Sequence, residues 1–91
     1  MTEFSPVCEY ERLTNRTKII NDIHQERLRQ DYLHPDKLNL AMRFVTIMEE
    51  AGEVAEAMQN KDNKAIYREL IDTAASCVRM AEEVLENNSN S

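Results

Sequence analysis

Residues that interrupt helices are scarce in this chain, and this scarcity constrains its fold more than any other feature. Of its 91 residues, one is glycine (Gly52) and two are proline (Pro6 and Pro35). Proline breaks a helix and disfavours helical backbone in the residue before it, so His34-Pro35 marks the first clear interruption. Apolar residues recur at helical spacing on both sides of this break. The sequence therefore predicts an all-α fold, a small antiparallel helical bundle.

Three helices are expected within one domain. The first should begin at Ser5-Pro6, with Ser5 as N-cap, and extend through roughly Gln30, although Thr14-Asn15 could divide it into two helices. The second should run from Asp36 or Lys37 to Gln59. After a turn at residues 60–63, with Asp62 or Asn63 as N-cap, the third should end near Leu85. The domain is thus predicted to span residues 1–86, and residues 87–91 are expected to form a disordered tail.

The second predicted helix carries an unusually broad apolar surface. At about 100° per residue, its apolar side chains cover more than half of the circumference, which exceeds what a surface helix of a monomer needs. We therefore expect this helix to be central and packed on more than one side. A domain of this size buries a modest fraction of its surface, so a homo-oligomer, either a dimer or a tetramer, is expected.

Charge and composition exclude several classes of partner. The formal net charge is −6, which disfavours binding to a nucleic-acid backbone. No apolar stretch approaches the length that spans a membrane, and no signal-peptide core follows Met1, so the cytoplasm is the expected location. The two cysteines, Cys8 and Cys77, do not have the spacing of a zinc site, and Cys77 is expected to be a buried free thiol.

Two groups of acidic residues stand on either side of the predicted turn. Glu50 and Glu53 would lie one helical turn apart, with Glu49 beside them, and Glu69 and Asp72 have the same spacing on the next helix. Like charges at this spacing repel by a few tenths of a kcal/mol per pair. Carboxylates converging from two helices would form an all-oxygen site, which suits Mg²⁺ or Mn²⁺ and is poor for zinc. The alternative is a solvated acidic surface, which is common on helices.

These residues resemble the signature of the MazG-like, all-α nucleoside triphosphate pyrophosphohydrolases. That signature is Glu-Glu-x-x-Glu on one helix and Glu-x-x-Asp on the next, and here the resemblance covers residues 34–81. His-Pro-Asp at 34–36, Gly-Glu-Val-Ala at 52–55 and Arg-Glu-Leu-Ile at 68–71 are also similar to small members of the family.

The resemblance implies a reaction and a site. The reaction is hydrolysis of a nucleoside or deoxynucleoside triphosphate to the monophosphate and pyrophosphate. Mg²⁺, with Mn²⁺ as the alternative, would be held by Glu50, Glu53, Glu69 and Asp72. Glu49 matches the first acidic position of the signature, which could orient or deprotonate the attacking water or could only tune the ligands.

Substrate contacts are less well defined by the pattern. Lys61, Lys64, Arg68 and Arg79 are candidates for phosphate contacts, and each could equally be a solvated surface charge. His34 could contact a base or a phosphate, and Ser76 occupies a position that is aromatic in some members. Because the chain also has no tryptophan, the resemblance predicts no preferred base.

Two other functions are compatible with a small acidic helical chain. A di-iron carboxylate bundle needs Glu-x-x-His twice, and the chain contains no Glu-x-x-His. A non-catalytic helical dimerisation or regulatory module, in which the broad apolar surface is simply an interface, stays open. Such a module would be indifferent to Mg²⁺.

Overall fold

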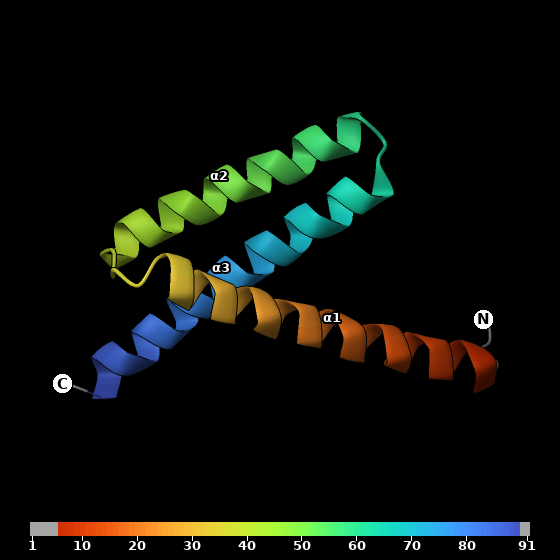
Figure 1. Ribbon diagram of the computed structural model, residues 1–91, viewed down its shortest axis with the longest axis horizontal. Coiled ribbons are helices and arrows are strands. Elements are labelled where there is room, and N and C mark those ends of the chain that lie inside the picture. The colour runs from red at the N-terminus through yellow and green to blue at the C-terminus, as the bar shows by residue number, and fades with distance from the viewer. Residues whose placement is uncertain (1–5, 90–91) are drawn as a thin grey trace.

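The structure is a computed structural model that describes the backbone of residues 6–89 and the side chains of residues 11–87. It contains three helices, α1 (Pro6–Leu33), α2 (Leu40–Gln59) and α3 (Asn63–Ser89), and no strand within residues 6–89 (Figure 1). The all-helical prediction is therefore confirmed. None of these helices is long and apolar enough to cross a membrane.

The first two helices differ from the predicted boundaries at the Pro35 break. α1 continues without interruption to Leu33, and the expected N-cap, Ser5, lies outside the described residues. α2 begins at Leu40, later than predicted. The reason is Asn39, whose extended backbone and side chain cap the helix, with Oδ1 accepting a hydrogen bond from the Met42 amide at 2.9 Å.

A tight turn joins α2 to α3 and makes the two helices antiparallel (Figure 1). Lys61 adopts a left-handed backbone with φ of 55°, and its amide donates to the Met58 carbonyl. Asp62 then caps α3, because its Oδ1 accepts from the Lys64 amide at 3.0 Å, so the cap predicted at Asp62 or Asn63 falls on Asp62. α3 reaches Ser89, so residues 87–89 are helical where a tail was expected; residues 90–91 lie outside the described range.

α3 is the helix that holds the fold together. It packs against α2 and is crossed by α1, whereas within residues 6–89 α1 and α2 make no comparable contact with each other (Figure 1). The prediction that the second helix is the central one is therefore wrong for the single chain. The broad apolar surface of α2 suggested burial on several sides, but α3 covers only one of them.

The interior of the chain is unusually polar. Among residues 11–87, the buried hydrophobic residues are Ile47, Ala57, Ile71 and Ala75. Six polar or charged residues are buried beside them, more than the hydrophobic ones: Arg27, Gln30, Arg43, Ser76, Arg79 and Glu83. Buried charges are costly unless they are paired, so ion pairs and hydrogen bonds must carry much of the contact between helices.

Many large apolar side chains, by contrast, face solvent in the single chain. Those on α2 are Met42, Phe44, Val45, Met48 and Met58, and those on α3 are Leu70, Val78, Val84 and Leu85. Cys77 lies on the same helix as the second group and is a free, exposed cysteine, so its predicted burial is wrong for the single chain.

Candidate active site

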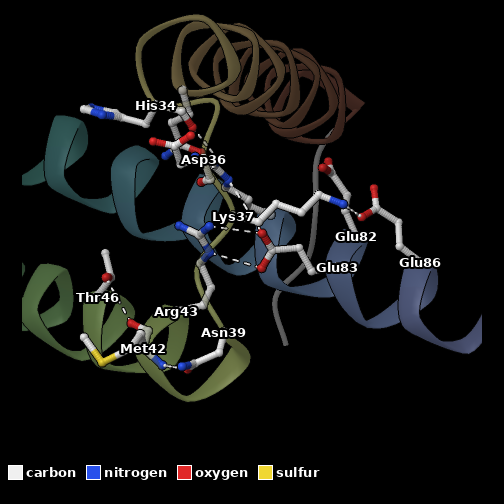
Figure 2. Close-up of polar contacts among 12 residues, drawn as sticks. His34, Asp36, Lys37, Asn39, Met42, Arg43, Thr46, Glu82, Glu83 and Glu86 are labelled. Atoms are coloured by element: carbon white, nitrogen blue, oxygen red, sulfur yellow. Dashed lines mark hydrogen bonds and ion pairs between the residues drawn. The ribbon is translucent and has the colours of Figure 1, made fainter.

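An ion pair between α2 and α3 sets the position of the two helices at one end of the hairpin. Arg43 donates from Nε to Glu83 Oε1 at 3.1 Å and from Nη2 to Glu83 Oε2 at 3.0 Å, so the guanidinium and carboxylate meet at two points (Figure 2). Arg79 also approaches the Glu83 carboxylate, at 4.0 Å. All three residues are more than nine-tenths buried.

Arg79 fixes the loop that connects α1 to α2. Its Nη2 donates to the backbone carbonyl of His34 at 2.6 Å and approaches the carbonyl of Asp36 at 3.4 Å. The loop is thereby held against α3, while the side chain of His34 is exposed. Arg79 thus has a structural partner that the sequence pattern did not reveal.

Arg27 attaches α1 to α3 through side-chain hydrogen bonds. It donates to both carboxylate oxygens of Glu82 on α3 and to Asp31 on its own helix. Its Nη1 also donates to Gln30 Oε1 at 3.1 Å, and Gln30 is itself buried. The orientation of the Gln30 amide follows from this contact, since a guanidinium only donates hydrogen bonds.

Carboxylates from all three helices, which we call the acidic cluster, lie near enough to Glu50 to raise the pKa of its carboxyl: Glu26, Glu53 and Asp72. Burial is the largest cause that raises the pKa of the Glu50 carboxyl above its usual range, and the negative charges of Asp72, Glu53 and Glu26 raise it further. The hydroxyl of Ser76 opposes this shift. One oxygen of Glu50, Oε1, is buried without a hydrogen-bond partner among the described residues. An unpartnered carboxylate oxygen beside other negative charges is a position that a cation would stabilise.

Other candidate residues lie around this cluster without joining it. Glu69 is half-buried on α3, one turn before Asp72, and Glu49 is exposed on α2. Lys64 is exposed at the start of α3, and Arg68 is exposed beside a cleft that Asp72 also lines. Ser76 is buried next to Glu50.

Two clefts flank the acidic cluster. The first, of about 550 Å³, lies between α1 and α3 and is rich in charge. Acidic and basic side chains share its lining: Asp22, Glu26, Arg29, Arg68 and Asp72, together with Tyr67. At its edge the hydroxyl of Tyr67 donates to Asp22 Oδ2 at 2.6 Å, and Lys18 Nζ bonds to the same oxygen at 2.6 Å.

The second cleft, of about 440 Å³, is bounded by the end of α1, the connecting loop, α2 and α3. Glu50 and Ser76 lie on one side of it, so it opens onto the acidic cluster. Leu33, Pro35 and Leu38 supply an apolar part of its lining. The polar part is formed by Gln30, His34, Asp36, Arg43, Thr46 and Arg79.

Comparison with models of known protein families shows to which family this chain belongs. The family model of the MazG nucleotide pyrophosphohydrolase domain matches residues 41–89, which is more than half of the chain. The chain belongs to this family. No curated protein and no solved structure gives a significant match. The matched range contains all of the acidic residues proposed from the signature, from Glu49 to Asp72, but it excludes α1 and the loop with His34.

The donor set of this MazG domain fits a hard divalent cation. Its oxygens are carboxylates, as Mg²⁺ prefers, and the buried Oε1 of Glu50 has no partner in the described protein. Within residues 11–87, however, no three acidic, histidine or cysteine side chains already converge as a metal site does. The flexible side chains of glutamate allow carboxylates on neighbouring helices to gather around a cation.

Sequence patterns did not indicate the contribution of α1. Glu26 lies close enough to Glu50 to raise its pKa, and it carries its own ion pair with Arg29 at 2.9 Å. Gln30 lines the second cleft. Neither residue belongs to an acidic motif, and both reach the site because α1 crosses α3. Their position at the site therefore results from helix packing and not from a local sequence motif.

Proposed function

We propose that this MazG domain hydrolyses a nucleoside or deoxynucleoside triphosphate to the monophosphate and pyrophosphate, with Mg²⁺ as cofactor. The observation that carries the proposal is the buried, unpartnered oxygen of Glu50 beside Asp72 and Glu53. Membership of the MazG family supports the reaction class.

Four carboxylates are proposed as ligands of the cation: Glu50, Glu53, Glu69 and Asp72. A bound Mg²⁺ would supply Lewis-acid polarisation of phosphate oxygens and a lowered pKa for a bound water. Without a cation, the same carboxylates would repel a polyphosphate. Glu50 is the anchor of the set, because its Oε1 is buried and has no hydrogen-bond partner within the described part of the chain. Glu53 and Asp72 carry the charges that face it from α2 and α3.

Glu49 is proposed to orient the attacking water or to accept its proton. It is exposed on α2 beside Glu50, so its carboxylate can reach solvent at the edge of the acidic cluster. A carboxylate that stays out of the cation's coordination is free to act on water.

Phosphate contacts are proposed for charged and polar residues in or near the two clefts. Arg68 is exposed beside Asp72 in the first cleft, and Lys64 lies one turn earlier on α3. In the second cleft, His34, Ser76 and Arg79 border the path to Glu50. Arg79 already holds the loop through backbone carbonyls, so any contact it makes with a ligand would come in addition.

We also propose that the active protein is a homo-oligomer, a dimer or a tetramer. Among residues 11–87, few hydrophobic residues are buried, while sixteen large apolar side chains are exposed. The exposed apolar surface spans both helices of the hairpin and would be covered by a second copy of this chain. A second copy packed there would bury another side of α2, as the broad apolar surface of this helix predicts.

The experiment is a screen of the common nucleoside and deoxynucleoside triphosphates with Mg²⁺, with pyrophosphate release as readout. Glu53→Gln and Asp72→Asn should each abolish release while leaving helix content by circular dichroism unchanged. Glu56→Gln is the matched control, because Glu56 is an exposed glutamate three residues from Glu53 on α2. Full turnover in Asp72→Asn would refute the ligand assignment. Absence of pyrophosphate release from every nucleotide would favour the non-catalytic module instead.

A further inference from the structure

We propose that Glu26 of α1 is a further ligand of the cation, so that a bound Mg²⁺ takes oxygens from all three helices and fastens α1 to the hairpin of α2 and α3. The inference rests on the proposed function. It adds to the proposed ligands a carboxylate that lies outside residues 41–89, the range that the MazG family model matches. The place of Glu26 in the fold, its burial and its ion pair support this assignment.

Glu26 lies on the side of α1 that faces the hairpin. It lines the first cleft together with Asp72, one of the proposed ligands on α3. Its charge also acts on Glu50 of α2. Burial is the largest cause that raises the pKa of the Glu50 carboxyl, and the charge of Glu26 is among the causes that raise it further. Glu26 is therefore close to proposed ligands on both helices of the hairpin.

The ion pair of Glu26 compensates its negative charge only in part. Arg29 Nη1 donates to Glu26 Oε2 at 2.9 Å, but the side chain of Glu26 is 16% exposed and that of Arg29 is 62% exposed. Solvent screens a guanidinium that is largely exposed, so this pair offsets little of the cost of a mostly buried carboxylate. The neighbouring Arg27 is buried too, but it has three side-chain partners. A cation at the cluster would supply the positive charge that Glu26 lacks.

One oxygen of Glu26 is left for a cation. The hydrogen bond from Arg29 engages Oε2, which leaves Oε1 as the oxygen for a metal. A carboxylate that binds a metal through one oxygen commonly accepts a hydrogen bond as well. Asp22, which also lies on α1 in this cleft, differs, because its Oδ2 already accepts from Lys18 and from the Tyr67 hydroxyl.

A ligand on α1 would couple the cation to the packing of this helix. Within residues 6–89, α1 has no contact with α2 comparable to its contact with α3, to which Arg27 and Glu82 attach it. A cation that binds only the arrangement in which its ligands meet stabilises that arrangement. Mg²⁺ should therefore slow amide hydrogen exchange in α1 as well as in the hairpin. A site built on α2 and α3 alone would protect the hairpin only.

The test measures binding of Mn²⁺ alone, without nucleotide, from the loss of the EPR signal of the free ion. Mn²⁺ shares the preference of Mg²⁺ for carboxylate oxygens. Glu26→Gln keeps an oxygen that can accept from Arg29 but removes the charge, and it should weaken binding by about tenfold or more. Glu11→Gln is the matched control, because Glu11 is an exposed glutamate on the same helix, and it should leave the affinity unchanged.

Arg29→Gln separates metal binding from the ion pair. It removes the partner of Glu26 and leaves the carboxylate, so the Mn²⁺ affinity should not fall. If Arg29→Gln and Glu26→Gln lost affinity equally, the ion pair would be the cause and the inference would be overturned. Should Glu26→Gln lose helix content in EDTA, Glu26→Asp takes its place. That variant keeps the charge but shortens the side chain by one methylene, and it should also weaken Mn²⁺ binding.

Hydrogen exchange followed by mass spectrometry gives a readout that does not depend on activity. In wild type, Mg²⁺ should slow exchange in the second half of α1, and Glu26→Gln should lose this effect while the hairpin keeps part of its protection. Asp72→Asn should lose the protection of both regions.

The outcomes distinguish the role of Glu26 from the proposed function. Wild-type Mn²⁺ affinity in Glu26→Gln, with binding lost in Asp72→Asn, would refute the role of Glu26 and leave the proposed site standing. A wild-type protein that binds no Mn²⁺ would overturn both. Binding that depends on Glu26, without pyrophosphate release from any nucleotide, would refute the proposed reaction and leave the three-helix site standing.

Discussion

Arg43 of α2 and Glu83 of α3 form a two-point ion pair, with Nε 3.1 Å from Oε1 and Nη2 3.0 Å from Oε2. The relative exposures of the two residues are 6% and 8%, so the pair lies inside the hairpin rather than on its surface. In a chain with so few buried hydrophobic residues, this contact is a principal link between α2 and α3.

Removing one partner of this pair should destabilise the fold strongly. Glu83→Gln leaves the guanidinium of Arg43 buried without a counter-charge, which should lower the free energy of unfolding by about 3–5 kcal/mol. Replacing both residues by apolar ones, in Arg43→Met with Glu83→Leu, should recover part of the loss, because the buried guanidinium of Arg79 also loses the Glu83 carboxylate. Urea unfolding monitored by circular dichroism at a fixed protein concentration measures both effects.

The control for this experiment is the exposed ion pair between Lys37 and Glu86, at 2.6 Å. Glu86→Gln should change stability little, since exposed pairs are screened by solvent. If Glu83→Gln proved as stable as Glu86→Gln, the buried pair would not be the link between the helices.

Glu50→Gln should stabilise the metal-free protein while abolishing its activity. Burial and neighbouring negative charges raise the pKa of Glu50, so its ionised form is disfavoured in the folded state. The destabilisation is present above the unfolded pKa of about 4.3 and is relieved as the pH falls through the raised folded pKa. The Tm difference between variant and wild type, measured in EDTA, should therefore shrink as the pH falls.

In EDTA the Glu50→Gln variant should have the higher Tm, and added Mg²⁺ should give wild type the higher Tm instead. Because a cation stabilises the folded state that binds it, Mg²⁺ should raise the Tm of wild type and leave that of Glu50→Gln almost unchanged. Equal responses of the two proteins to Mg²⁺ would show that Glu50 is not a ligand.

Asp22→Asn should weaken the attachment of α1 to α3. Asp22 accepts hydrogen bonds from Lys18 and from Tyr67, which lower the pKa of its carboxyl. The stabilisation is present above the unfolded pKa of about 3.9 and is lost as the pH falls through the lowered folded pKa. The Tm of the variant should thus lie below that of wild type at neutral pH, and the two should converge in acid. If the Tm difference between variant and wild type did not depend on pH, the charge of Asp22 would not contribute to the attachment of α1.

Phe44→Glu or Met48→Glu should dissociate the proposed oligomer. Both side chains are about half exposed in the single chain, and a charge there would have to be buried against a second copy. Sedimentation equilibrium at micromolar concentration should show a smaller species than wild type, whereas Gln59→Glu on the same helix should not. A wild-type protein that is monomeric at this concentration would contradict the proposal directly.

The helices and the acidic motifs were predictable because their signals are local. Apolar spacing, the break at Pro35 and the cap at Asp62 each depend on neighbouring residues, as does the one-turn spacing of Glu50 with Glu53 and of Glu69 with Asp72. The start of α2 was missed because Asn39, rather than the residues after Pro35, supplies the cap.

How the helices face one another depends on contacts between distant parts of the chain. Local patterns specified three helices and two acidic pairs, but they placed α2 at the centre, where the structure has α3. The crossing of α1 over α3 brings Glu26 toward Glu50 and Gln30 into the second cleft. The loop packing likewise gives Arg79 its carbonyl partners. These contacts join residues more than 20 positions apart, and no local spacing encodes the angle at which two helices pack.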